Sequence, residues 1–253
     1  MNRAGLAAAA LLASLACAAE DRPDPWEARA EAGHDSLDHG LAPWHEAMLQ
    51  LAWRPHTGLA AFGGGRETER FDQRDREAFA GAYLPLGAAS TTLHLEGSSS
   101  PTHHVLARSV VLAEVSHSLG DGWVPSIGAR LARYDASDVR TVTAGLEKYL
   151  GDWRLAYSGW ASKTDTSGWA AAHRLSATWY HGELTYVSLA GARGREVENF
   201  FPAGLVTTGV RAASIAAGLE LAPRIGVSAE LAETRQGNLY RRRGVRIGSR
   251  FLF

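Results

Sequence analysis

The chain has 253 residues, and its 26 lysine and arginine residues nearly balance its 27 aspartate and glutamate residues, for a formal net charge of −1 at pH 7. This balance argues against a general nucleic-acid binder, because such proteins neutralise phosphates with an excess of basic side chains. Beyond the amino-terminal region, no apolar run approaches the roughly 18 residues that a membrane-spanning helix requires. We therefore exclude membrane crossing by helices.

The amino-terminal residues have the pattern of a secretory signal. Met1-Asn2-Arg3 is basic, Leu6 to Ala16 is apolar, and small residues surround Cys17. This pattern predicts a signal peptide over residues 1–19, removed on export. The alternative is lipidation of Cys17, although a bacterial lipobox usually has Leu where this chain has Ser14. Either route takes the chain out of the cytoplasm.

The remaining chain, 20–253, has the pattern of successive β-strands. Apolar and polar residues alternate with period two, and turn residues bound each segment. Tight turns are expected at 84–87, 119–122, 150–152, 180–182 and 221–224, and longer polar connections at 67–73, 97–103, 164–168 and 194–207. Short and long connections alternate in bacterial outer-membrane barrels, where short turns face the periplasm.

Counting back from the carboxyl end gives thirteen strands. They are expected near 44–54, 57–66, 74–84, 90–96, 104–119, 123–134, 138–150, 153–163, 170–180, 183–193, 208–221, 225–236 and 241–253. Bacterial single-chain barrels have an even number of strands, so a further strand is expected within 20–43, at Trp26 to His34. A helix is the alternative there, because Ala, Glu and Arg favour helices. We predict an all-β, closed antiparallel transmembrane barrel of about fourteen strands, or twelve if the first hairpin stays outside the wall.

The last strand shows the alternation most clearly. Val245, Ile247, Phe251 and Phe253 share one face, and the opposite face carries arginines. In an outer-membrane barrel, apolar groups face lipid and polar groups face the lumen. We expect the barrel assembly machinery to recognise this strand, which ends at Phe253.

Charged residues on the opposite parity are expected to line the lumen. The set is Arg130, Glu147, Arg154, Arg174, Glu230, Arg246 and Arg250. A polar interior is common to such barrels, and long side chains can fill a barrel of this size or leave a narrow passage. The sequence leaves open a narrow conduit and a filled scaffold. The segment 104–119 alternates poorly, and its facing is not assigned.

Several motifs resemble the YaiO family of outer-membrane barrel proteins, over residues 44–253. They are Ser100-Pro101-Thr102-His103-His104-Val105-Leu106, Leu119-Gly120-Asp121-Gly122-Trp123, Arg133-Tyr134, the segment from Gly145 to Trp153, Ala172-His173-Arg174, the segment from Gly194 to Glu198, and Gln236-Gly237-Asn238-Leu239-Tyr240. The resemblance implies a barrel in the outer membrane of a Gram-negative cell, with no established activity. Some relatives carry an amino-terminal helical repeat domain and are linked to surface polysaccharide. Only residues 20–43 precede the matched region here, and no such domain fits in them.

An enzyme is the alternative function, as a barrel hydrolase acting on outer-leaflet lipid. The His103-His104 pair lies beside Ser98 to Ser100 in an expected outer loop, and His173 lies near Asp165 and Ser167. A histidine can serve as the general base for a serine or a water molecule. Neither neighbourhood has a hydrolase signature, so no catalytic residue is assigned.

No metal or cofactor is expected. The rings of His103 and His104 would point to opposite faces of a strand, and the sequence supplies no further ligands. Gly63-Gly64-Gly65 lacks the lysine and the strand–loop–helix setting of a phosphate loop. Backbone crowding or a bend in the barrel is the expected reason for these glycines.

The basic cluster Arg241-Arg242-Arg243 is expected at the outer rim, at the height of lipopolysaccharide phosphates. Arg211, Arg193 and Arg195 are expected at a similar height. Arginine binds phosphate through two parallel hydrogen bonds, so this cluster is a candidate lipopolysaccharide contact. The alternative is that these arginines pair with carboxylates inside the barrel, namely Glu196, Glu198 or Glu233.

Overall fold

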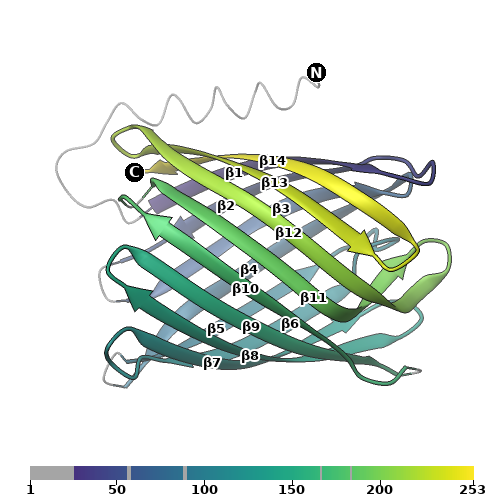
Figure 1. Ribbon diagram of the computed structural model, residues 1–253, viewed down its shortest axis with the longest axis horizontal. Coiled ribbons are helices and arrows are strands. Elements are labelled where there is room, and N and C mark those ends of the chain that lie inside the picture. Colours follow the sequence, from purple (N-terminus) through teal and green to yellow (C-terminus); the bar gives the residue numbers. More distant parts are fainter. Residues whose placement is uncertain (1–25, 56–57, 88–89, 166, 183) are drawn as a thin grey trace.

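A computed structural model describes residues 26–253 except 56–57, 88–89, 166 and 183. Fourteen antiparallel strands form a closed barrel, in which every strand pairs with its chain neighbours and β1 pairs with β14 (Figure 1). The strands are β1 (Trp26–Leu37), β2 (Trp44–Trp53), β3 (Ala60–Arg70), β4 (Gln73–Leu86), β5 (Thr91–Ser99), β6 (Ser109–His117), β7 (Trp123–Arg133), β8 (Asp138–Leu150), β9 (Trp153–Thr164), β10 (Ala170–Tyr180), β11 (Tyr186–Phe200), β12 (Gly204–Ala222), β13 (Ile225–Gln236) and β14 (Tyr240–Leu252).

The predicted fold class and the count of fourteen strands are confirmed. The segment predicted as the first strand pairs on both sides, with β2 and with β14, and the helical alternative for it is wrong. None of the described residues belongs to a helix with the length and apolarity needed to cross a bilayer. The expected signal peptide lies outside the described residues.

Short connections occur at both ends of the barrel, for example residues 71–72 and 151–152, and the strand termini distinguish one end from the other. Trp26 and Phe253 close the seam at one end, where each backbone N–H donates to the other residue's carbonyl, at 3.1 and 2.9 Å. We refer to this as the inner end, since the strand termini of bacterial barrels face the periplasm with the short turns. The connection 100–108 lies at the opposite, outer end. Recognition of the strand ending at Phe253 by assembly machinery stays a prediction.

Alternation assigns the two faces of the wall. In β14, Val245 and Ile247 are exposed. Arg246, which lies between them, and Arg242, which lies earlier in the strand, are partly buried. The register carries this parity to the next strand, where Leu231 lies opposite Val245 and shares its outward face. Exposed outward side chains on a barrel of this kind contact lipid.

Two predicted segments differ from the structure at the outer end. The strand predicted at 104–119 runs only from Ser109 to His117, because residues 100–108 leave the wall and turn into the lumen. The polar connection predicted at 194–207 is instead a continuation of β11 to Phe200 and of β12 from Gly204, paired along its length. Sequence polarity misidentified this hairpin as a loop, since it extends beyond the lipid-facing part of the wall.

Glycines make room for aromatic rings inside the barrel. Gly64 on β3 lies opposite Phe79 on β4, and Phe62 lies opposite Gly81. A Cβ atom on Gly64 would lie 2.7 Å from the Phe79 Cζ atom, and one on Gly81 would meet the Phe62 ring. The crowding predicted for the glycine run is thus present at Gly64.

We expect Gly81→Val to destabilise the barrel by about 1–3 kcal/mol, because overpacking forces a neighbouring ring out of place. Unfolding in guanidinium chloride, followed by tryptophan fluorescence in detergent, measures the change. Gly97→Val is the matched control, since a Cβ there meets nothing closer than the Val110 carbonyl oxygen at 3.8 Å. Equal stability of Gly81→Val and the wild type would contradict the crowding.

Candidate functional site

The charged residues expected in the lumen lie on the inward parity of their strands. Glu230 pairs in register with Arg246, and both line an interior cavity of about 230 Å³ together with Arg174 and Arg242. Small side chains on β11, β12 and β13 also line this cavity. They are Ala190, Ala192, Ala212, Ser214 and Ala232. Three arginines and one glutamate thus face a space that small residues leave open.

A second group of charges lies on β8 and β9, near the inner end of the barrel. The Arg154 guanidinium on β9 donates through Nε to Glu147 on β8, over 2.9 Å, and forms a second bond through Nη2. The Tyr149 hydroxyl donates to the same carboxylate over 2.9 Å. Arg130 on β7 lies opposite Thr141 and shares the parity of Glu147. Glu147 and Arg154 neutralise each other, unlike the charges that line the cavity.

At the inner end, Glu27 gathers three arginines. Its side chain is only 1% exposed, and its Oε2 atom lies 2.7 Å from Arg250 and 3.1 Å from Arg54, while Arg29 pairs with Oε1. Glu27 and Arg29 belong to β1 and Arg250 to β14, so this cluster bridges the seam of the barrel. Arg250 was among the residues predicted to line the lumen, whereas Glu27 was not, although its inward parity was the available signal.

An apolar cluster fills the outer mouth of the lumen. Trp44, Phe71, Val105 and Tyr240 are buried against one another, and we refer to these four residues as the outer plug. The Trp44 ring meets Phe71 and Tyr240 edge to face, with centroids 5.0 and 5.3 Å apart. Further apolar side chains pack around the plug. They are Leu37, Leu41, Leu106, Phe200 and Leu239.

The plug contains residues from widely separated parts of the wall. Trp44 begins β2, Phe71 lies in the β3–β4 turn, Val105 lies in the β5–β6 connection and Tyr240 begins β14. Since β14 and β5 are not neighbours in the sheet, the cluster crosses the mouth. The packed side chains of this cluster leave little room for water between them.

A second apolar cluster extends the closure toward β7 and β8. Ala107, Ala132 and Val139 are buried there, and Val110 and Tyr134 pack against them. Burial raises the pKa of the Tyr134 phenol, which lies in the β7–β8 connection. The poor alternation of the segment 104–119 now has a reason, because its inward apolar residues pack in this cluster and are shielded from lumen water.

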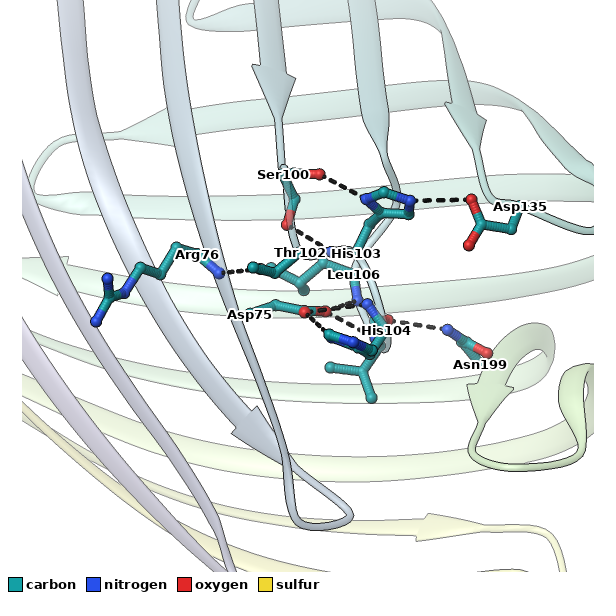
Figure 2. Close-up of polar contacts among 10 residues, drawn as sticks. Asp75, Arg76, Ser100, Thr102, His103, His104, Leu106, Asp135 and Asn199 are labelled. Carbon is teal, nitrogen blue, oxygen red and sulfur yellow. Dashed lines mark hydrogen bonds and ion pairs between the residues drawn. The ribbon is translucent and has the colours of Figure 1, made fainter.

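Asp75 fixes residues 100–108, which we refer to as the inward connection. Figure 2 shows the Asp75 carboxylate beside this connection. Oδ1 accepts the His104 backbone N–H at 3.0 Å and the His104 Nδ1 at 2.9 Å. Oδ2 accepts the backbone N–H groups of Val105 and Leu106 at 2.7 and 2.8 Å. Asp75 is fully buried. One carboxylate on β4 therefore satisfies three backbone donors of the connection.

Two further side chains hold the same connection from other parts of the barrel. The Asn199 amide at the tip of β11 donates to the Val105 carbonyl oxygen over 3.0 Å. His103 Nε2 lies 3.0 Å from an Asp135 carboxylate oxygen in the β7–β8 connection (Figure 2). The inward connection is thus held from three directions, and the sequence indicated none of these contacts.

The geometry does not support the neighbourhoods considered for a hydrolase. His104 binds Asp75, and no serine or threonine hydroxyl in the described part of the chain bonds to that ring. His103 contacts the backbone carbonyl of Ser100. His173 lies on the outward face, bonded at 2.7 Å to the Tyr157 hydroxyl, whereas Asp165 contacts Ser137 and Arg140 and Ser167 contacts Thr164.

The other histidines and carboxylates form no metal site. Within the described ranges, no three or more His, Cys, Asp or Glu side chains gather in a way that could hold a metal ion. Asp165, for example, contacts Ser137 and Arg140. No described group of residues therefore calls for metal-assisted chemistry.

The predicted lipopolysaccharide contacts separate into three kinds. The prediction that Arg242 contacts lipopolysaccharide is wrong, because its guanidinium points inward, 3.3 Å from Asp35 and over the Trp44 ring. Arg241 and Arg243 face outward and both bind Glu233. Arg211 faces outward and has no carboxylate partner among the described residues.

The alternative was that the rim arginines pair with carboxylates inside the barrel, and it is wrong for Glu196 and Glu198. Glu196 accepts from the Gln236 amide at 3.3 Å, and Glu198 accepts from the Tyr240 hydroxyl at 2.9 Å. The Glu233 pairs do form, but on the outward face. The inward glutamates at the hairpin tip therefore bind Gln236 and Tyr240 and pair with none of the rim arginines.

Comparisons with known proteins agree with this architecture. The model of the YaiO membrane β-barrel domain matches residues 27–199. Curated proteins give no significant match to the chain. Solved structures of similar fold include a bacterial polysaccharide outer membrane secretin, with a TM-score of 0.57, 10% identity and coverage of 92% of this chain and 100% of that one.

Two further barrels show the same likeness. The Acinetobacter baumannii outer membrane protein Omp33 has a TM-score of 0.57 at 11% identity, over 92% of this chain and 100% of its own. The KdgM porin has a TM-score of 0.52 at 9% identity, over 89% and 99%. At such identities the likeness shows the fold alone. The chain belongs to the YaiO membrane β-barrel family and is a barrel of the outer membrane.

Proposed function

We propose that this protein is a sealed outer-membrane barrel that serves the envelope as a scaffold, and that it does not act as an open pore. The observation that carries the proposal is the outer plug, which joins β2, the β3–β4 turn, the β5–β6 connection and β14 across the mouth. Asp75 holds that plug in place through three backbone hydrogen bonds. Loops in constant exchange with solvent would not need a buried carboxylate as an anchor.

A narrow conduit that opens under control is the second candidate. The cavity beneath the plug favours it, because Arg174 and Arg246 line it beside the single Glu230, while Arg242 is already paired with Asp35. Such a lining suits an anionic solute, since arginine donates paired hydrogen bonds to carboxylate and phosphate groups. An acidic polysaccharide fits this chemistry, and the polysaccharide secretin of similar fold makes a link to surface polysaccharide worth testing.

Conductance across a planar lipid bilayer tests the proposal. We expect the inserted wild-type protein to carry no current, because an apolar layer across the mouth blocks hydrated ions. The migration of unheated protein on detergent gels reports that the sample is a folded barrel. Discrete current steps from the unmodified protein would contradict the sealed scaffold, and anion selectivity of those steps would support the conduit.

A further inference from the structure

Four arginines lie in direct register across the outward face of four adjacent strands. Arg193 on β11 pairs with Arg211 on β12, Arg211 with Arg235 on β13, and Arg235 with Arg241 on β14. All four are exposed on the parity that faces away from the lumen. We refer to these four residues as the arginine row. The register between the four strands produces this row.

The four arginines of the row repel one another unless an anion compensates their positive charge. Directly opposed residues on one face have Cβ atoms about 5 Å apart, and like charges there are destabilising. Arg241 is compensated by Glu233, through two hydrogen bonds of 2.7 Å. No carboxylate among the described residues pairs with the other three, nor with nearby Arg195. The row therefore holds three uncompensated guanidinium groups.

These side chains surround a hollow. A cavity of about 510 Å³ on this face is lined by Arg193, Arg195, Arg211 and Arg235. Its floor contains residues without side chains that could fill it, namely Gly194, Gly209 and Gly237. The space is large enough for several phosphate-sized groups, and its charged walls come from side chains that pair with no carboxylate among the described residues.

The position of the arginine row along the barrel axis indicates which kind of anion it would meet. Four residues toward the inner end, the same strands and face carry exposed Leu189, Ile215 and Leu231. That spacing is about 13 Å along a strand at roughly 3.4 Å per residue. The leucines and isoleucine lie within the lipid-facing belt. The row therefore lies where the hydrocarbon of the outer leaflet gives way to its headgroups.

We propose that the hollow along the arginine row binds the phosphate groups of an outer-leaflet lipid of the lipopolysaccharide type. Each guanidinium can bind a phosphate through two parallel N–H···O bonds, and the bound phosphate removes the repulsion between neighbouring arginines. The other side of the barrel shows the contrast. Arg74 and Arg76, also outward at the outer end, already pair with Glu69 and Glu67.

Binding of lipid A to the detergent-purified full-length protein, counted by native mass spectrometry, tests this proposal. We expect the wild type to retain diphosphoryl lipid A, and the double variant Arg193→Gln with Arg211→Gln to bind it at least tenfold more weakly. Lipid A stripped of its phosphates should bind the wild type as weakly as the diphosphoryl form binds the variant. The double variant should stay folded, because glutamine fits the same exposed positions and relieves repulsion.

The matched control is Arg74→Gln with Arg76→Gln, which removes two outward arginines at similar height. It should bind diphosphoryl lipid A as the wild type does. Equal loss in both double variants would reduce the effect to general surface charge and overturn the site, as would undiminished binding by Arg193→Gln with Arg211→Gln. Displacement of lipid A by an equal concentration of inorganic phosphate would assign the site to free phosphate and contradict the lipid proposal.

Discussion

Replacing Asp75 with alanine is expected to turn a silent barrel into one that passes current in discrete steps. The change leaves three backbone N–H groups of residues 104–106 without their acceptor at a fully buried position. An unsatisfied buried donor costs about 1–3 kcal/mol, so the inward connection loses most of what holds it. Val105 then leaves the outer plug, and the mouth opens. Planar-bilayer recording of the variant beside the wild type measures the effect.

Glu77→Ala is the control for this experiment. Glu77 belongs to the same strand and faces the lumen, but it contacts Arg66 and the Ser98 hydroxyl and makes no bond to residues 104–106. Its removal should leave the barrel silent. A folded Asp75→Ala barrel that still carries no current would show that the mouth is closed by something other than the anchored connection.

Replacing Glu27 with glutamine is expected to lower the free energy of unfolding by about 3 kcal/mol, the lower end of the range for breaking a buried ion pair. The lower end applies because the three arginines around Glu27 are 19–45% exposed and partly hydrated. Loss of the carboxylate leaves Arg29, Arg54 and Arg250 to repel one another beside the β1–β14 seam. Guanidinium chloride unfolding in detergent, followed by tryptophan fluorescence, measures the loss.

Glu31→Gln provides the comparison, on the same strand and the same inward face. Glu31 is exposed and forms no ion pair with any described residue, so its replacement should change stability by less than about 0.5 kcal/mol. If Glu27→Gln and Glu31→Gln unfold at the same denaturant concentration, the seam does not depend on the arginine cluster around Glu27.

The wall of the barrel could be predicted because its signals are local. Side chains alternate with period two along any strand, so Val245 and Arg246 reveal their faces without knowledge of their neighbours. The same alternation, together with the even-number rule, pointed to a first strand at Trp26, and the structure has it there. Lipid outside and water inside enforce the pattern, since a charge on the lipid face is costly.

The closure of the mouth could not be predicted from the residues that form it. Residues 104–108 read along the chain as the start of a strand, and they turn inward because Asp75 offers acceptors to their backbone and Trp44 and Tyr240 offer an apolar surface. These partners lie far away in the sequence. The sequence alone gives no distance between these residues, so the outer plug could not be predicted from it.

The sequence by itself determined most of the strands and their facing, because alternation is a property of each strand alone. Only the tertiary structure decided which arginines face one another and which face a carboxylate. Arg242 meets Asp35 inside the barrel, whereas Arg211 meets Arg193 and Arg235 outside it. Register fixes these encounters, and register depends on hydrogen bonds between strands that the chain brings together only when the barrel closes.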